Sequence, residues 1–200
     1  MYNELDNFIF DSPPEKINFC IKCGSKVEFN LPTDGDENKR FICTKCNFVH
    51  YQNPKIVVGT LSVHNNKILL CKRAIQPQKN KWTLPAGFME NGETSVNGAW
   101  RETFEEACAK VNITKIFSLM NIPKAMQVHI FYLADFDGNH ATSSESLETQ
   151  LFAIDEIPWD ELAFNSVYYT LKNYISYIQS NKASELPFHS TIKFNNIVNT

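Results

Sequence analysis

The amino-acid sequence predicts an α/β fold, a mixed sandwich of strands and helices with a small separate module in front of it. Two observations predict the sandwich: residues 56–63 and 67–74 are β-rich runs, and two later segments carry apolar residues at helical spacing. A third observation predicts the module, because two C-x-x-C pairs lie between residues 20 and 46. A chain of 200 residues is long enough for one ordinary domain plus such a module.

The order of the segments predicts four regions. An N-terminal tail (1–14) ends in two prolines, a cysteine module (15–50) follows, and a larger α/β domain (54–180) precedes a C-terminal tail (181–200). In the larger domain, the two β-rich runs should form a hairpin across His64, Asn65 and Asn66. The later elements are, in chain order, a helix that starts near Thr94 or Ser95, strands at 128–136 and 149–154, and a second helix at 166–180.

Composition and charge limit the functional classes to which this chain can belong. The chain is 43% hydrophobic, which supplies a substantial core, and its 19 Lys+Arg nearly balance its 22 Asp+Glu. This balance does not support a general nucleic-acid or acidic-membrane binder. No apolar run approaches the roughly 20 residues of a membrane span, and the N-terminal stretch lacks the features of a signal peptide. We therefore expect a cytoplasmic protein that does not bind membranes.

The cysteine module (15–50) is predicted to be a zinc ribbon. Its two C-x-x-C pairs are separated by 19 residues, a spacing typical of tetrahedral zinc sites. A segment of about 35 residues cannot bury enough surface to fold unaided, and zinc binding would supply the missing stabilisation. Four thiolates close the coordination shell, so the Zn²⁺ should be structural; the alternatives are a redox pair or unrelated thiols. The ligands would be Cys20, Cys23, Cys43 and Cys46, whereas Cys71 and Cys108 are expected to be ordinary buried thiols.

Zinc ribbons can bind nucleic acid, which makes this module a candidate for that role. Between Glu15 and Lys55, seven Lys+Arg and five Asp+Glu give a net charge of only +2. Aromatic side chains of the module could stack on bases, but in so small a module they are expected to form its core: Phe19, Phe29, Phe41, Phe48 and Tyr51. Nucleic-acid binding is therefore the less favoured interpretation.

The stretch GFMENGETSVNGAWRETFEEACA (87–109) concentrates glutamates on a predicted helix. At about 100° per residue, Glu102, Glu105 and Glu106 share one face. A different face carries residues at the i, i+3, i+4, i+7 and i+11 positions of a buried stripe: Val96, Ala99, Trp100, Thr103 and Ala107. The simplest alternative is a solvated helix face, because like charges at such spacings cost only about 0.2–0.5 kcal/mol per exposed pair.

The complete pattern is Gly87, five residues, Glu93, seven residues, and then RETFEE at 101–106. It closely resembles the signature of the Nudix hydrolase family, Gly-x5-Glu-x7-Arg-Glu-hydrophobic-x-Glu-Glu-x-Gly-hydrophobic, and the preceding WTLPA is also similar to that family. Three positions depart from the family pattern, and they concern packing and the helix exit rather than any carboxylate: Thr103, Cys108 and Ala109.

The resemblance implies a Nudix α/β/α sandwich and a Mg²⁺ (or Mn²⁺) site on this helix. It implies that Glu102 and Glu106 are the main metal ligands, that Glu105 helps to hold a further ion or water, and that the carbonyl of Ala86 contributes. The family hydrolyses a nucleoside diphosphate linked to another moiety, through attack of metal-activated water on one phosphorus. Mg²⁺ prefers such oxygen ligands and shares them with substrate phosphates.

Residues outside the three glutamates complete the predicted site. The resemblance implies that Arg101 and Glu93 brace the loop against the helix. Many family members take a further carboxylate from a later loop, and here Glu145 is predicted as a ligand or water-orienting base; a carboxylate in solvent is the alternative. The candidate substrate-binding residues are Arg73, which could meet phosphate or adenine, and Trp82 and Phe88, which could stack on a base.

The ribbon, the connector HYQNPK and the glutamate pattern in series resemble a ribbon-bearing branch of the Nudix family. Members specialised for NADH carry a Ser-Gln-Pro-Trp-Pro-Phe-Pro-like stretch where this chain has SLMNIPKAMQVHIFY (118–132). The resemblance therefore implies that the substrate is ADP-ribose or FAD. The alternatives are a pyrophosphatase for NADH or NAD-capped RNA, and a non-catalytic nucleotide-sensing regulator that binds nucleic acid. Dimers are common among such relatives, so a homodimer is one option.

Overall fold

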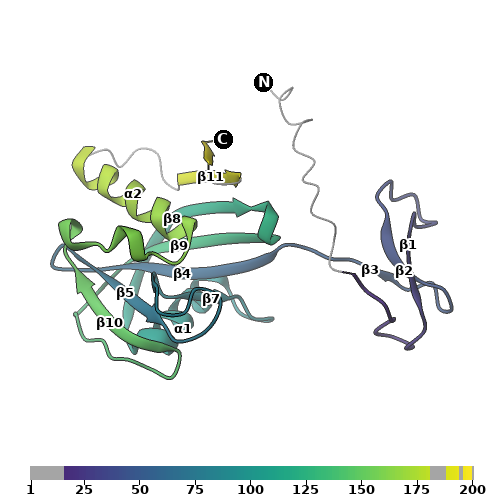
Figure 1. The fold of residues 1–200 in the computed structure, drawn as a ribbon, viewed down its shortest axis with the longest axis horizontal. Coiled ribbons are helices and arrows are strands. Elements are labelled where there is room, and N and C mark those ends of the chain that lie inside the picture. The colour runs from purple at the N-terminus through teal and green to yellow at the C-terminus, as the bar shows by residue number, and fades with distance from the viewer. Residues whose placement is uncertain (1–15, 181–187, 194–195, 200) are drawn as a thin grey trace. The chain divides into compact units, whose positions relative to one another are not determined.

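The structure is a computed structural model that describes residues 16–180, 188–193 and 196–199. The predicted tail at 1–14 lies outside the described residues. The chain divides into two compact units between Pro54 and Lys55 (Figure 1). Neither helix of the described part has the length and apolar character of a bilayer-crossing segment.

The first unit contains three short strands, and the second contains two helices and the remaining strands. Short 3₁₀ turns at Pro123–Ala125, Ile154–Glu156 and Trp159–Glu161 lie between elements of the second unit. The strands and helices are β1 (Val27–Asn30), β2 (Arg40–Cys43), β3 (Val49–His50), β4 (Lys55–His64), β5 (Lys67–Arg73), β6 (Trp82–Thr83), β7 (Ala86–Phe88), α1 (Ser95–Ala107), β8 (Val111–Ile122), β9 (Gln127–Phe136), β10 (Ser146–Phe152), α2 (Asn165–Ser180), β11 (Phe188–Lys193) and β12 (Asn196–Asn199).

The first unit is a three-stranded antiparallel sheet in the order β1-β2-β3. Cys20 and Cys23 precede β1, whereas Cys43 ends β2 and Cys46 follows it. A tight turn forms at each pair: the N–H of Gly24 donates to the carbonyl of Cys20, and that of Asn47 donates to the carbonyl of Cys43. Cys20 and Cys43 are buried, whereas Cys23 and Cys46 are exposed. A module with so little apolar interior depends on this cysteine cluster for its core.

The second unit is built on a mixed sheet in the order β10-β5-β4-β9-β8-β11-β12, with β6 paired to β5 and β7 paired to β4. The predicted hairpin is confirmed: Val63 pairs with Ile68 and His64 with Lys67. Its turn residues Asn65 and Asn66 have φ of 47° and 61°. Positive φ at both positions is what a two-residue type I′ hairpin requires, and asparagine tolerates it better than most residues.

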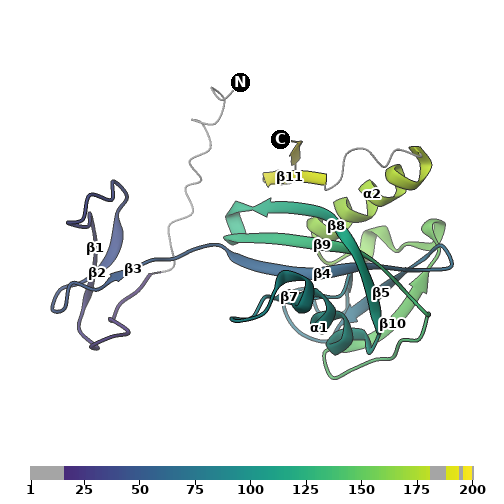
Figure 2. The ribbon, with the colours of Figure 1, turned by 180° about the vertical axis from the view of Figure 1, so that it is seen from behind.

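The two helices lie on opposite faces of this sheet (Figures 1 and 2), so the predicted α/β/α sandwich is confirmed. Side chains of the central strands alternate between the two faces, as the period of two in a strand demands. The face toward α2 buries Leu61, Ile68, Leu70, Phe117, Phe131, Val167 and Leu171. The face toward α1 buries Val58, Leu69, Cys71, Ala99, Ala107, Tyr132 and Ala134.

Several strands were not foreseen. β8 has register shifts against β9 between Ile113 and Lys115 and between Ile116 and Ser118, and such bulges interrupt the alternation by which a strand is recognised. β10 starts three residues before the predicted strand, at Ser146. Residues 181–200 were expected to form a tail, yet they contain β11, which runs parallel to β8, and β12, which pairs with β11. β11 pairs with β8, a strand about 70 residues earlier in the chain, and a contact at such a distance leaves no local pattern in the sequence.

Candidate active site

Helix α1 starts and ends with identifiable caps. The side chain of Thr94 accepts a hydrogen bond from the N–H of Asn97 at 3.2 Å, which satisfies one of the free donors of the first turn. At the other end, Cys108 adopts a left-handed conformation with φ of 51°, and its N–H donates to the carbonyl of Phe104. Cys108 thus takes the place of the usual glycine cap, and it is exposed rather than buried as the sequence analysis expected.

The three glutamates of α1 do not form a solvated helix face. Glu102 and Glu106 are each only 8% exposed, whereas the side chain of Glu105 is 46% exposed. Burial raises the pKa of Glu106 to about 8; the neighbouring charge of Glu102 adds to this, while the N–H of Ala86, at 3.0 Å, and the charge of Arg73 act in the opposite direction. Burial also raises the pKa of Glu102. Burial therefore disfavours the charged form of both carboxylates, even though Glu102 accepts a hydrogen bond from Arg101 at 2.7 Å.

The strand β7 lies directly against these carboxylates. A Cβ at Gly87 would overlap the carboxylate of Glu102, so any other residue here would displace that side chain. A Cβ at Gly59 on the neighbouring β4 would likewise overlap Pro85 and Ala86. The N–H of Ala86 reaches Glu106, and the proposed role of its carbonyl as a metal ligand stays a prediction. The close approach gives a physical reason for a glycine at this position of the glutamate pattern.

Arg101 connects the loop to the helix, as the resemblance implied. Its guanidinium donates two hydrogen bonds to Glu93 at 3.1 and 2.8 Å, one each to Glu102 at 2.7 Å and Glu105 at 2.8 Å, and one to the carbonyl of Phe88 at 3.1 Å. These contacts hold the pKa of Glu93 at about 2 and raise the pKa of Arg101 further above its ordinary value. The planar guanidinium has five N–H donors in a fixed arrangement and can bond to all of these acceptors at once, whereas a lysine ammonium could not.

The departures from the family pattern are accommodated by local packing. Thr103 is fully buried, and its hydroxyl donates to the carbonyl of Ala99 at 2.7 Å and lies 2.7 Å from the hydroxyl of Thr60. Thr60 in turn lies 2.7 Å from the hydroxyl of Ser62, so a short polar chain replaces the hydrophobic contact of the family. Ala109 is buried beside the end of the helix. None of these changes displaces a carboxylate.

Glu145 lies next to the buried glutamates although it is distant in sequence. Its charge contributes to the raised pKa values of Glu102 and Glu106. The loop is fixed to the end of α1: the hydroxyl of Ser143 is 3.5 Å from the carbonyl of Glu106 and accepts from the N–H of Glu145 at 3.1 Å. The N–H of Ala74 donates to the carbonyl of Glu145 at 3.2 Å. The carboxylate of Glu145 therefore belongs to the same acidic cluster.

The three predicted substrate-binding residues have different surroundings. Arg73 lies at the end of β5, where its Nε donates to the carbonyl of Pro77 at 2.9 Å and its charge acts on Glu106. Phe88 is 48% exposed next to the glycine loop and can still meet a ligand. Trp82 is only 5% exposed, and its ring packs edge-on against the core ring of Phe152 at 4.8 Å. This burial contradicts the predicted stacking of Trp82 on a base.

In the first unit, the four cysteines of the two C-x-x-C pairs converge. Their sulfur atoms all lie within 4.8 Å of one another, with pairs at 3.4, 3.5 and 3.7 Å. Four sulfurs about 2.3 Å from one tetrahedral zinc ion would be about 3.8 Å apart, so the cluster fits that ion. The backbone N–H groups of Cys46 and Lys45 lower the pKa of the Cys43 thiol, which favours the thiolate that a metal binds.

Sequence reasoning missed two residues that shape the acidic cluster. Gly59 lets β7 approach β4, and a lone glycine within a strand is a recognised signal of close backbone approach. Ser143 fixes the loop that carries Glu145. A serine in a polar loop has no signal of its own, because its role depends on the nearby end of α1.

Fold and site together define an α/β domain with two buried glutamates on α1, preceded by a module in which four cysteines converge. Comparison with known families agrees: the NUDIX domain matches residues 53–172, and the Nudix N-terminal zinc ribbon matches residues 18–52. The chain belongs to the Nudix family.

Individual relatives are consistent with this assignment. A crystal structure of a NUDIX hydrolase from Nitrosomonas europaea is 44% identical, with a TM-score of 0.82, and covers 88% of this chain and 99% of its own. The NAD-capped RNA hydrolase NudC of Haemophilus influenzae is 29% identical over 72% of this chain and 54% of its own length. The ADP-ribose pyrophosphatase of Methanocaldococcus jannaschii is 31% identical over 58% of this chain and 70% of its own. The chain thus spans about half the length of its NudC relatives.

Proposed function

We propose that this chain is a Mg²⁺- or Mn²⁺-dependent pyrophosphohydrolase that cleaves the diphosphate linkage of ADP-ribose or FAD. The observation that carries the proposal is the burial of two glutamates one helical turn apart, Glu102 and Glu106, each only 8% exposed. A divalent cation would offset the cost of burying their charges, and oxygen ligands on one helix face suit a hard ion. The proposed division is a zinc ribbon at 15–50, whose Zn²⁺ is structural, and a catalytic domain at 54–180.

The proposed roles follow from the surroundings of each side chain. Glu102, Glu106 and the Ala86 carbonyl would hold the cation, with Glu105 contributing to a further ion or water. When bound, the cation supplies charge compensation to the diphosphate and makes water a better nucleophile. Arg101 fixes the glutamates through its shared hydrogen bonds.

Two further carboxylates and the loop residues complete the proposal. Glu145, which is exposed and whose charge acts on Glu106, is proposed to orient the attacking water and to accept its proton at a carboxylate oxygen. Glu105 is the second exposed carboxylate proposed for this role. Arg73 is proposed to meet a phosphate, because its charge already acts on Glu106. Phe88 is proposed to stack on the adenine.

The choice of substrate rests on the segment after the glutamate pattern. In this chain residues 118–132 form the end of β8, a 3₁₀ turn and the start of β9, and they lack the stretch associated with NADH. ADP-ribose, FAD and NADH contain the same diphosphate, so discrimination must come from contacts beyond it. The name of the M. jannaschii relative, ADP-ribose pyrophosphatase, supports this substrate class.

A second candidate function has its own supporting observation. The NudC relative aligns over 148 residues, more than the 123 residues of the ADP-ribose pyrophosphatase relative. NADH and NAD-capped RNA are therefore the alternative substrates.

Steady-state kinetics on ADP-ribose, FAD, NADH and NAD-capped RNA at one Mg²⁺ concentration tests the proposal. We expect kcat/KM for ADP-ribose or FAD to exceed that for NADH by at least about tenfold, which requires only about 1.4 kcal/mol of differential transition-state binding. NADH or capped RNA as the best substrate would favour the second candidate. No hydrolysis of any of the four by zinc-loaded, folded protein would overturn both.

A further inference from the structure

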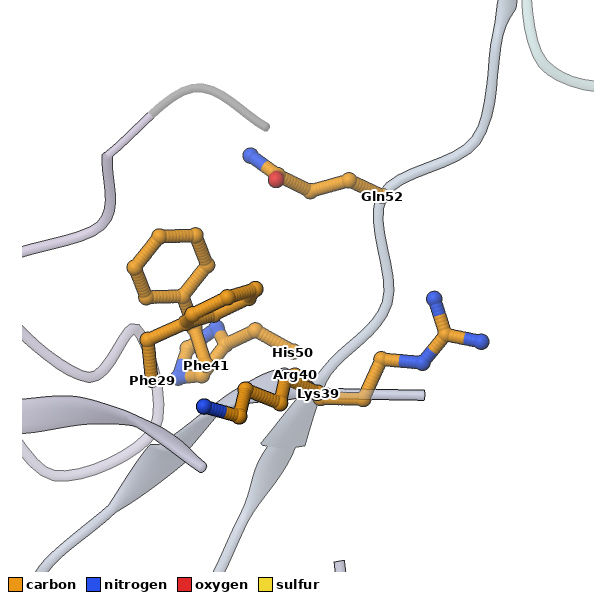
Figure 3. A pocket seen from close by; sticks show the side chains of 6 residues that line it. All are labelled: Phe29, Lys39, Arg40, Phe41, His50 and Gln52. Carbon is orange, nitrogen blue, oxygen red and sulfur yellow. The ribbon is translucent and has the colours of Figure 1, made fainter. Parts of the chain in front are cut away.

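The zinc ribbon has a hollow on its sheet that neither the cysteine cluster nor the proposed hydrolysis uses. It is lined by side chains of the three strands and of the segments beside them, and all belong to the first unit (Figure 3). Its volume is about 40 Å³, enough for the edge of a planar group or a few water molecules. The lining residues are Phe29, Lys39, Arg40, Phe41, His50 and Gln52.

His50 contributes to this hollow a buried polar atom whose hydrogen bonding is unexplained. The residue is only 5% exposed, and its Nε2 is buried without a hydrogen-bond partner among the described residues. Its ring meets Phe48 edge-on, with centroids 4.9 Å apart, so this neighbour supplies no acceptor or donor for that nitrogen. Buried polar atoms in folded proteins are almost always hydrogen-bonded to protein, water or ligand. An imidazole nitrogen can donate or accept, depending on the tautomer.

Aromatic rings form one wall of the hollow. Phe29, Phe41 and His50 occupy one cross-strand row, because Phe29 pairs with Phe41 in β1–β2 and Phe41 pairs with His50 in β2–β3. The Phe29 and Phe41 centroids are 4.9 Å apart with the rings tilted by 46° (Figure 3). Phe41 is buried, but Phe29 is 46% exposed and leaves ring surface open to a ligand. An open ring beside a buried hydrogen-bonding nitrogen is suited to a heteroaromatic base.

Lys39 and Arg40 add positive charge at the rim, but they are not equivalent. Arg40 is held by Asp36 at 2.8 Å and lies over the ring of Tyr51 at 5.5 Å, and Figure 3 shows its guanidinium directed away from the phenylalanine rings. Lys39 is exposed, and no carboxylate among the described residues forms an ion pair with it. The rim therefore carries one uncompensated cation, which favours an anionic group next to the base.

We propose that this hollow binds one nucleoside phosphate unit. The base lies over Phe29 with its edge hydrogen-bonded to Nε2 of His50, and the phosphate lies near Lys39. The same unit occurs as a free mononucleotide and within single-stranded RNA, so the chemistry is shared by two sources. This site does not depend on the proposed hydrolysis, because it lies in the ribbon and needs no diphosphate.

The test uses the full zinc-loaded chain, labelled with ¹⁵N-histidine, in buffer without Mg²⁺. AMP and a deca-adenylate RNA are titrated in turn while the imidazole nitrogen signals are followed by NMR, with His50→Gln used to assign the His50 signal. We expect a saturable shift of the His50 Nε2 signal. A shift with AMP identifies a free mononucleotide as a sufficient ligand, and a shift only with the decamer identifies an RNA strand.

Matched variants localise the binding. Lys39→Glu and Phe29→Ala should each weaken binding by at least about tenfold, since one stacked base or one phosphate contact accounts for that much. The controls are Lys45→Glu, which makes the same charge change at an exposed lysine outside the hollow, and Phe19→Ala, which removes a 65% exposed ring of the same unit. Zinc content and backbone NMR spectra verify that each variant is folded.

Two results would overturn the proposal. Neither AMP nor the decamer shifts the His50 signal, in which case Nε2 bonds only to water. Alternatively, Lys45→Glu weakens binding as much as Lys39→Glu, in which case binding follows overall charge. An inactive enzyme with an intact His50 shift would count against the proposed hydrolysis alone.

Discussion

The ribbon and the acidic helix each gather side chains of the kinds that bind metal ions, but they do so in opposite ways. In the ribbon, four thiols from two C-x-x-C pairs bring their sulfurs within 4.8 Å of one another, and no other residue type is needed. On α1, Glu102 and Glu106 are buried together, whereas Glu105 on the same helix and Glu145, which directly precedes β10, are exposed. The first cluster is complete in itself, whereas the second is open on one side.

This difference corresponds to the two uses of a metal ion in proteins. A closed set of four soft sulfur ligands leaves no position for water or substrate, and its contribution is to folding. An open set of hard oxygen ligands leaves room for water and phosphate oxygens, and its contribution is to chemistry. Disrupting each cluster should therefore produce a different kind of defect.

Disrupting the closed cluster should have the largest effect on stability. Zinc binding in such modules contributes about 10–16 kcal/mol, so Cys43→Ser should lose the metal and the hydrogen-exchange protection of the ribbon. Elemental analysis of protein purified without added metal should find about one zinc per wild-type chain. Cys108→Ser, which removes an exposed thiol outside the cluster, should retain it. A zinc content near zero in folded wild-type protein would exclude the predicted site.

Disrupting the open cluster should abolish chemistry but not folding. Glu106→Gln keeps the shape of the side chain and removes the charge proposed to hold the cation, so kcat should fall at least about a hundredfold. Zinc content and the circular dichroism spectrum should not change. Glu161→Gln, at an exposed carboxylate of a 3₁₀ turn, is the control and should leave turnover unchanged. Undiminished turnover of the Glu106 variant would mean that the metal site is elsewhere.

The open cluster should also make stability depend on pH when Mg²⁺ is absent. The pKa of Glu106 is raised from 4.5 to about 8 on folding, so between these values the folded chain binds more protons than the unfolded chain. Stability should then fall as pH rises through this window, by up to about 1.4 kcal/mol per pH unit. Urea denaturation at pH 5, 6.5 and 8 measures the slope. Glu106→Gln or saturating Mg²⁺ should reduce it, and an identical slope in the variant would refute this origin.

The two clusters also differ in how far the sequence could predict them. Cysteine spacing is local, so it identified all four members of the ribbon cluster, whose sulfurs converge in the structure. The helical period likewise identified Glu102, Glu105 and Glu106 as one face. Burial of two of them could not be predicted, because it depends on Gly87 and β7 lying against the helix.

Elements that depend on distant partners were predicted less well. β8 was missed because two bulges interrupt its alternation, and β11 was missed because its pairing partner lies far away in the chain. Trp82 was predicted to stack on a base because it flanks the glycine loop, but packing against Phe152 buries its ring. Tertiary contacts outweighed local sequence context in each case.

The smallest predicted effect concerns the polar chain under the acidic helix, which has no counterpart in the ribbon. Thr103→Val removes one hydroxyl from the buried chain of Thr103, Thr60 and Ser62, and should cost about 0.5–1.5 kcal/mol. Replacing all three hydroxyls, with Thr60→Val, Ser62→Ala and Thr103→Val together, removes every partner at once and should recover most of that loss. Urea denaturation of the three single variants and of the triple variant shows whether the hydroxyls contribute to stability together or independently. A triple variant whose loss equals or exceeds the sum of three separate losses would show that the chain stabilises α1 by more than mutual satisfaction.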